Sequence, residues 1–452
     1  MSEFERFCKQ VNLLLVIDHA GRAGNGFFQT IFDCHPQVLA CPWMHYVYSY
    51  LLTEYGDAEL LDAGHVRASW PQTTYFSLLY HELDEPRAAL IRKMGGDPAG
   101  ELDRAAVRRT FDDLLQARET ISRRELVAAI FFSYAKGLGR DPEVIRYILC
   151  PDSISLRGES VMSGFSGKVI DHAVNDFPEA RLIHLERDPR AGFASSNHQF
   201  INQLGNMYGL RAGSFRQRLG RLRSRDFDWD SVFVFGFWLL YFRQTCKAVM
   251  RKRAEYPERF LTVRNEDLNL DFVPTMQRLS AELGIDWLAD WNDDFTPTML
   301  GKPWAGTGAY NNRYQTYRYG PLRNDPDHVA SSVSGPNAYV TQRWRSRLAP
   351  REILLVEALL AEEIEHFGYE LLYWKGEARS PGRLRAALWR PLKGELPTPR
   401  WILDGLRVSG RDFLDRLFYL LVFPVFYVEA RRIFLAILRE GDIFEIQAGN
   451  AA

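Results

Sequence analysis

The chain has 452 residues, of which 46% are hydrophobic, so it can bury a large core. It is long for one domain, and we expect one elaborated domain or one domain with an appendage. The net charge of −1 excludes an overall basic footprint for nucleic acid. Five scattered cysteines predict reduced core residues of a cytoplasmic protein, and the polar N-terminal segment predicts neither a signal peptide nor an N-terminal membrane anchor.

The first predicted strand, a glycine-rich turn and a predicted helix together occupy residues 11–35. Gly21, Gly24 and Gly26 allow the backbone to turn its N–H groups inward, and the helix directs its N-terminal amides to the same point. This order is typical of a phosphate cradle, although a plain strand-turn-helix corner has the same glycines. The Gly-Lys-Ser/Thr ending of a magnesium-binding P-loop is missing, which predicts a phosphate-bearing ligand handled without that metal.

Residues 55–140 change to charged helical periodicity, which predicts a helical insertion between the first and middle strands of a sheet. Residues 153–157 are predicted to form the next strand, followed by a helix near 165–177. Residues 229–254 predict a long helix whose aromatic side chains belong to the core.

A second segment with the pattern of a phosphate site begins with a predicted buried strand over Arg181–Arg187. Asp188–Arg190 then fixes a turn into a predicted helix. Arg187, with Ser195 eight residues later, would bring a guanidinium group and a hydroxyl around one point, which suits a phosphate. The alternative for Arg187 is a surface salt bridge. Two phosphate sites on neighbouring strand ends indicate a bis-phosphorylated ligand.

These motifs resemble those of the sulfotransferases that use 3'-phosphoadenosine 5'-phosphosulfate (PAPS). Gly21–Gly26, followed by Cys34–Pro36, is similar to the arginine version of the family's 5'-phosphosulfate loop. Arg187–Arg190 with Ser195 matches the family's 3'-phosphate motif.

Three later segments are also similar to the family. Phe260–Leu268 resembles the strand that ends in Tyr-Glu-Asp-Leu, except that Asn265 replaces the tyrosine. Residues 301–304, and then 344–348 with 367–369, look like the loop and last helix of bacterial-type and carbohydrate-type members. The resemblance covers residues 10–50 and 140–370.

The resemblance implies an α/β fold, namely a P-loop NTPase-like three-layer α/β/α sandwich with a parallel central sheet. Residues 1–374 would form the sulfotransferase domain, with its helical insertion at about 55–140 near the acceptor. Residues 375–452 would add a C-terminal helical extension. The implied reaction moves a sulfuryl group from PAPS, as co-substrate and without a metal, to a hydroxyl or amine. We expect the acceptor to be a saccharide or lipid-linked small molecule.

The resemblance also assigns roles to residues. Arg22 would neutralise charge on the leaving 5'-phosphate, and Arg187 with Ser195 would hold the 3'-phosphate. A loop with aromatic and amide side chains would cover the adenosine, although a plain surface turn has similar residues. The predicted co-substrate residues are Arg22, Ala23, Gly24, Asn25, Gly26, Phe27, Arg187, Ser195, Trp304, Gly306, Tyr310 and Asn311.

The base that removes the acceptor proton has two candidates. Glu159 follows Arg157 at the predicted end of the middle strand, where some members place a catalytic histidine. His45 lies in the region where carbohydrate-type members carry a glutamate. A solvated carboxylate and a core imidazole are the alternatives, and one sequence does not decide between them. His35, before Pro36, is expected to be structural.

Residues 375–452 carry 13 Lys and Arg against 9 Asp and Glu. The apolar run Leu417–Val428 within them is flanked by arginines and is shorter than the roughly 20 residues that span a bilayer. Residues 400–445 therefore predict either a peripheral contact with the inner face of a membrane or a helix that packs on the domain or forms a homodimer.

Two other functions remain open at this stage. A nucleotide kinase could use the same cradle, but it would need the missing Gly-Lys-Ser/Thr ending. A membrane-recruited nucleotide-binding or assembly protein could keep the fold and lack catalysis.

Overall fold

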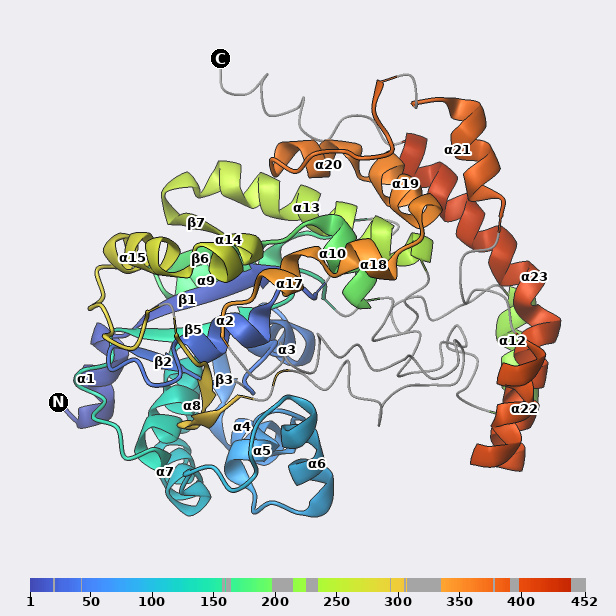
Figure 1. Cartoon of the computed structure of the whole chain (residues 1–452). Coiled ribbons are helices and arrows are strands. Elements are labelled where there is room, and N and C mark those ends of the chain that lie inside the picture. Colours follow the sequence, from blue (N-terminus) through green and yellow to red (C-terminus); the bar gives the residue numbers. More distant parts are fainter. Residues whose placement is uncertain are drawn as a thin grey trace.

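The structure is a computed structural model. It describes residues 1–18, 21–41, 43–156, 159, 164–196, 214–224, 235–292, 294–304, 306, 335–376, 379–390 and 398–439. Its centre is a parallel five-stranded sheet in the order β2-β5-β1-β6-β7 (Figure 1). The strands are β1 (Asn12–Asp18), β2 (Val38–Ala40), β5 (Tyr147–Asp152), β6 (Arg181–Glu186) and β7 (Phe260–Arg264). The predicted α/β class with a parallel central sheet is confirmed.

The middle strand differs from the prediction. β5 ends at Asp152, so the observed strand lies just before residues 153–157, where it was expected. The reason is local hydrogen bonding: the Ser155 backbone N–H donates to Ser153 Oγ at 3.2 Å, a turn-forming bond that competes with sheet pairing. The apolar residues before it are buried between β2 and β1 instead.

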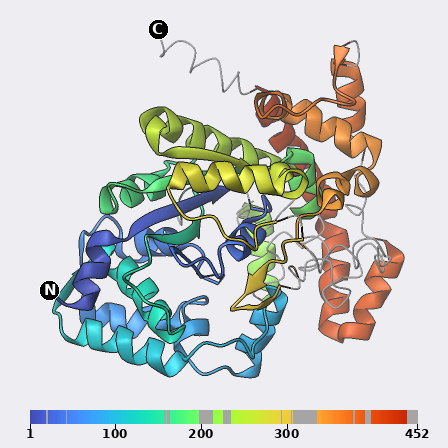
Figure 2. The same ribbon diagram turned by 60° about the vertical axis from the view of Figure 1, so that its left-hand side comes forward.

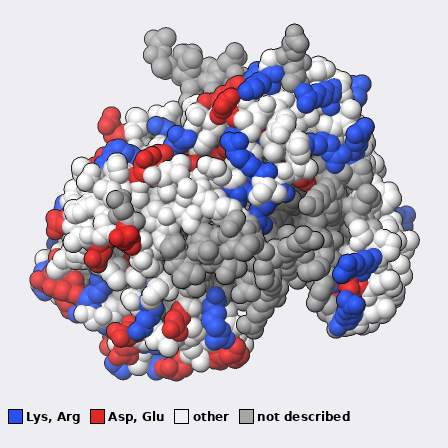
Figure 3. Space-filling model, in the orientation of Figure 1, with Lys and Arg blue, Asp and Glu red and all other residues white. Residues whose placement is uncertain are grey.

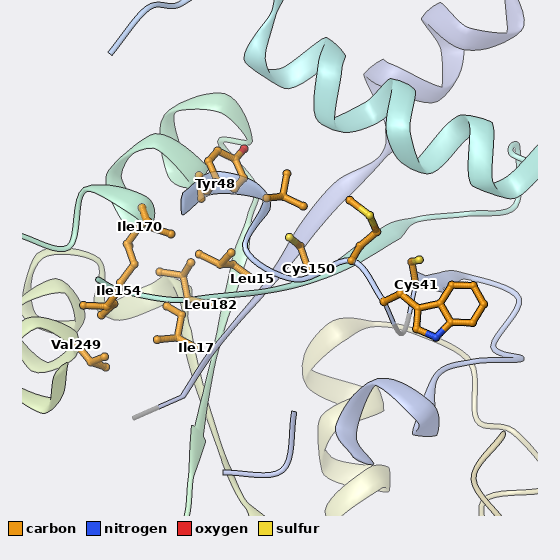
Figure 4. Close-up of a cluster of buried hydrophobic side chains, with 14 of the residues drawn as sticks. Leu15, Ile17, Cys41, Tyr48, Cys150, Ile154, Ile170, Leu182 and Val249 are labelled. Atoms are coloured by element: carbon orange, nitrogen blue, oxygen red, sulfur yellow. The ribbon is translucent and has the colours of Figure 1, made fainter. Parts of the chain in front are cut away.

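Helices cover both faces of the sheet because β1 is apolar on both sides. Leu13, Leu15 and Ile17 belong to one buried cluster, part of which Figure 4 shows. Leu14 and Val16 belong to a second cluster on the opposite face. The first cluster includes residues of α3 (Val47–Tyr55), α9 (Lys168–Asp176) and α13 (Phe235–Glu255), and the second includes residues of α2 (Asn25–Ile31) and α15 (Phe272–Leu283). The result is three layers, α/β/α.

The segment between β2 and β5 is largely helical, as predicted, but it also contains a small antiparallel sheet. In this sheet, β3 (Leu60–Asp62) pairs with β4 (Thr120–Ser122). The elements are α3, β3, α4 (Ala63–Ser69), the 3-10 turn Trp70–Gln72, α5 (Ser77–Tyr80), α6 (Glu85–Lys93), α7 (Arg104–Gln116), β4 and α8 (Arg123–Gly137).

The C-terminal part is also helical. Its elements are α19 (Pro350–Leu359), α20 (Ala361–His366), α21 (Pro381–Leu388), α22 (Pro399–Val408) and α23 (Gly410–Arg439). Figures 1 and 2 show α22 beside the N-terminal part of α23 at the periphery of the molecule, away from the central sheet. Within the described ranges, no helix is both long and apolar enough to cross a membrane.

The cysteine expectation holds for three residues only. Cys41, Cys150 and Cys246 are buried, whereas Cys8 is half-buried and Cys34 is exposed. Cys34 follows α2 where the chain reaches the surface, so the prediction that every cysteine is a core residue is wrong for it. All five are free thiols.

Candidate functional site

The turn after β1 has an unusual backbone. Gly21 and Arg22 both have φ of 73°, and Gly24, which directly precedes α2, has φ of 112°. An arginine in this region costs roughly 1–3 kcal/mol of strain. A Cβ added to Gly24 would lie 2.2 Å from Nδ2 of Asn265, a buried residue that begins α14 (Asn265–Leu270). The dihedral angle and the close neighbour both require glycine at this position.

Three of the predicted phosphate-binding residues meet at this turn. β1 and β6 are adjacent parallel strands, so their carboxyl ends lie together. Arg22 Nε donates to Oγ of Ser195, on α10 (Pro189–Ser196), at 3.0 Å. Arg187, which follows β6, donates from Nη1 to the Arg22 carbonyl at 2.7 Å and from Nη2 to the Val340 carbonyl at 3.2 Å. Two guanidinium groups and one hydroxyl therefore share a small volume, where a ligand with more than one anionic group would be favoured.

Arg187 is not a surface salt bridge. Arg187 is only 5% exposed, and its Nε is buried with no hydrogen-bond partner in the described part of the chain. A buried charged donor without an acceptor is costly. An anionic oxygen bound beside the turn would remove that cost.

The rest of the motif after β6 is structural. Arg190 is 3% exposed and pairs with Asp188 at 2.8 Å and with Glu357, on α19, at 2.6 Å. Its guanidinium also lies 4.5 Å from the centre of the Trp344 ring. The Asp188 backbone N–H donates to Glu266 at 3.1 Å, and burial raises the pKa of the Glu266 carboxyl. These contacts hold the chain that carries Arg187 in place.

His45 lies against the helix that follows the turn. Its Nε2 is 3.4 Å from Nε2 of Gln29, a fully buried residue one turn into α2. Its ring also packs near Tyr75, with centroids 5.4 Å apart. His45 is half-buried.

The start of α3, just after His45, is anchored by Asp152 at the end of β5. The Asp152 carboxylate accepts the backbone N–H groups of Tyr48 at 2.6 Å and of Ser49 at 3.2 Å. Burial raises the pKa of Asp152 to about 6. The segment that carries His45 is thereby fixed to the central sheet.

Glu159 has a different environment. Its Oε2 accepts the Leu156 backbone N–H at 3.3 Å, and its Oε1 accepts that of Ser166 at 3.0 Å. Each carboxylate oxygen thus accepts one backbone N–H group. Arg157, beside which Glu159 was expected to act, lies outside the described residues.

The loop expected to cover the adenosine approaches the same helix. Trp304 stacks near Phe27 of α2, with ring centroids 6.3 Å apart, and its Nε1 donates to the Met94 carbonyl at 2.9 Å. Gly306 lies beside Gly95, because a Cβ on Gly95 would be 2.2 Å from the Gly306 carbonyl oxygen. Tyr310 and Asn311 lie outside the described residues. Ala23 is buried, and Asn25 and Gly26 form the first turn of α2.

Sequence reasoning missed several residues that support the site. Asp33, just after α2, accepts hydrogen bonds from Thr298 Oγ1 at 2.9 Å and from the backbone N–H groups of Leu300 at 3.0 Å and Gly301 at 2.8 Å. Asp33 therefore holds the loop that leads to Trp304. Gln29 and Asp152 were missed in the same way. No local pattern marks such residues, since their partners are distant in sequence.

No group of three or more His, Cys, Asp or Glu that could hold a metal ion occurs among the residues that the structure describes.

Comparison with family models identifies the family of this chain. Residues 20–289 match the model of the sulfotransferase family. One similar solved structure is the sulfotransferase domain from the Synechococcus PCC 7002 olefin synthase, at 17% identity over 80% of this chain and 97% of that one, with a TM-score of 0.41. Another is the sulfotransferase domain from the curacin biosynthetic pathway, at 13% identity over 80% and 100%, with a TM-score of 0.37. A search of curated proteins finds no match.

Proposed function

The chain belongs to the sulfotransferase family, and we propose that it transfers a sulfuryl group from PAPS to a hydroxyl or amine of a saccharide or lipid-linked small molecule. One observation carries the choice of donor: Arg22, Arg187 and Ser195 converge from two neighbouring strand ends. A donor with phosphate groups at both ends of its ribose needs two such anion-binding groups close together.

The residues present fit this co-substrate. Arg187 Nε is a buried donor that lacks an acceptor in the described part of the chain, as expected of a group that completes its hydrogen bonds with a 3'-phosphate. Gly24, with its positive φ and its close packing on Asn265, sets the turn before α2, whose N-terminal amides would face a 5'-phosphate. Phe27 and Trp304 supply aromatic surface beside it for a purine. We assign these roles to residues within 1–374.

When bound, PAPS supplies an activated sulfuryl group. In the transfer, the bond from sulfur to the phosphate oxygen breaks, and a bond from sulfur to the acceptor oxygen or nitrogen forms. Arg22 neutralises the negative charge that develops on the leaving phosphate. Its guanidinium is already oriented by Ser195, so little reorganisation is needed as that charge grows.

We propose His45 as the base that takes the acceptor proton. The contact with Gln29 holds the imidazole against the helix whose first turn would bind the donor; His45 Nε2 accepts from the Gln29 amide there, so this long contact at 3.4 Å must give way to the acceptor proton. Both oxygens of Glu159, the other candidate, are engaged by backbone amides. Replacement of His45 by Gln should lower kcat by about 10²–10⁴-fold and leave nucleotide affinity unchanged. Glu159→Gln should change kcat far less, and the reverse ranking would assign the base to Glu159.

The donor is tested by calorimetric titration with 3'-phosphoadenosine 5'-phosphate, the product nucleotide, and with AMP. The wild type should prefer the bis-phosphate, and Arg187→Ala should lose about 10–100-fold in affinity for it, as expected for charge-assisted hydrogen bonds. Arg181→Ala is the matched control, because Arg181 lies at the opposite end of β6. Equal binding of both nucleotides, or an unaffected Arg187→Ala variant, would refute the assignment.

A turnover assay and a titration with ATP, added to this experiment, separate the two rival functions. Bis-phosphate binding without turnover of radiolabelled PAPS, across a screen of hydroxyl and amine acceptors, would favour a nucleotide-binding protein without catalysis. A preference for ATP that depends on magnesium would favour a kinase.

A further inference from the structure

The helices α22 and α23 form a packed hairpin whose buried side chains join the first hydrophobic cluster of the domain. Trp401 and Tyr419 are each 1% exposed, and their ring centroids are 5.6 Å apart. Gly405 allows close approach of the two helices, since a Cβ there would lie 2.8 Å from Cα of Phe413. The hairpin is therefore a packed element. Its outward side chains are exposed because the two helices pack on their other faces, and not because the helices fray.

Those outward side chains on α23 form an apolar stripe. Leu414 and Leu421 are 62% and 72% exposed, Leu417 is 39% exposed and Val428 is 44% exposed. Their spacing of three, four and seven residues places them on one side of the helix. Over 14 residues at about 1.5 Å each, the stripe is roughly 21 Å long, which is too short to cross the roughly 30 Å core of a bilayer. We call these four residues the leucine stripe.

The described acidic side chains of the hairpin are buried, and two of them form ion pairs: Asp404 with Arg407 at 2.9 Å and Asp412 with Arg416 at 2.6 Å. Asp404, Asp412 and Asp415 are buried, at 6%, 4% and 5% exposure. By contrast, Arg407 and Arg411, at the turn between the two helices, are exposed. Other exposed arginines of this region are Arg383, Arg385, Arg390, Arg400 and Arg432. Figure 3 shows blue residues along the edge of the molecule where α21 and α22 lie, with a red residue between those at α22. No exposed side chain that the structure describes on α22 or α23 is acidic, so the described surface beside the stripe is apolar and basic.

This charge distribution decides between two occupants. A second copy packed symmetrically against the stripe would bring arginines near its ends into proximity with arginines of the partner, which is unfavourable. Anionic phospholipid headgroups would pair with the same arginines while the leucines enter the acyl boundary.

We propose that the leucine stripe of α23 docks on the surface of an anionic phospholipid bilayer, with the helix parallel to the membrane plane. The four apolar side chains insert between headgroups, and Arg407 and Arg411 bind lipid phosphates. This surface is distinct from the sulfuryl-transfer site, and the proposal stands whether or not the donor is PAPS.

Flotation of the full chain with vesicles tests the proposal. One set contains equal parts phosphatidylglycerol and phosphatidylcholine, and the other contains phosphatidylcholine alone. We expect binding to the anionic vesicles only, and weaker binding as salt concentration rises. Leu414→Glu/Leu421→Glu should reduce that binding by about a hundredfold, because two large apolar side chains are lost from the interface. Arg411→Gln should reduce it by about fivefold.

Leu60→Glu is the matched control, since Leu60 is 64% exposed but lies in β3; its binding should equal that of the wild type. Thermal unfolding of the double variant should match the wild type because both leucines are exposed. Equal binding to neutral vesicles, or full binding by the double variant, would overturn the proposal. So would a dimer in sedimentation equilibrium that the double variant dissociates, together with no vesicle binding.

Discussion

The turn between β1 and α2 and the hairpin of α22 and α23 use arginine in opposite ways. At the turn, Arg187 is 5% exposed and is oriented by two backbone carbonyls. In the hairpin, the side chain of Arg407 is 74% exposed and pairs with the Asp404 carboxylate at 2.9 Å. A buried guanidinium acts in a low dielectric and can select one ligand geometry, whereas exposed arginines are screened by solvent and attract any anionic surface.

The sharpest way to test the effect of burial is to remove one buried and one exposed arginine. Arg190→Ala leaves Asp188 and Glu357 buried without their cation and should lower the free energy of unfolding by about 3–5 kcal/mol. Arg407→Ala removes a largely exposed partner and should cost less than about 1 kcal/mol. Urea denaturation measures both. Comparable losses would show that burial does not distinguish the two regions.

A smaller effect is expected from the backbone of the turn. Gly24→Ala meets both an unfavourable φ and the Asn265 amide, and should lower the free energy of unfolding by roughly 2–3 kcal/mol. Gly21→Ala is the matched control, because Gly21 has a positive φ but no atom within 4 Å of its added Cβ. Strain alone should then cost about 1 kcal/mol.

Gly24→Ala should lose more unfolding free energy than Gly21→Ala, and adding Asn265→Ala to Gly24→Ala should restore part of that extra loss. Equal losses of unfolding free energy in Gly24→Ala and Gly21→Ala would mean that the Asn265 side chain moves aside without cost.

The smallest effect concerns pH and the structural histidine behind α2. The His35 Nδ1 accepts the Gln37 backbone N–H at 3.1 Å, and its Nε2 contacts the Asp286 carbonyl at 2.9 Å, so the ring is neutral in the fold. Burial lowers the pKa of His35 below its ordinary value of 6.5. Its contribution to stability is therefore present above pH 6.5 and is lost as the pH falls through the lowered pKa.

The free energy of unfolding, measured in urea at pH 7 and pH 5, should fall less in His35→Asn than in the wild type. Asparagine can accept the same N–H and does not titrate there. Identical pH dependence in both proteins would contradict a neutral, buried His35.

Much of the site could be predicted because its chemistry is local. Two local patterns indicated phosphate-binding sites at the ends of neighbouring strands. One is glycines at fixed spacing after an apolar run, and the other is a serine eight residues after an arginine. The family and the α/β fold class are confirmed, and Arg22, Arg187 and Ser195 are in contact. The roles of these residues, and of His45 and Glu159, stay predictions.

The sequence by itself determined the class of fold, the positions of the two phosphate motifs and the apolar, arginine-flanked character of the C-terminal segment, because each is written in residues close along the chain. Only the tertiary structure decided that β5 stops at Asp152, that Arg190 is part of a buried ion pair, and that Asp404, Asp412 and Asp415 are buried while Leu414 and Leu421 are exposed. These outcomes depend on which distant elements pack together, and burial, unlike residue type, is a property of the assembled chain.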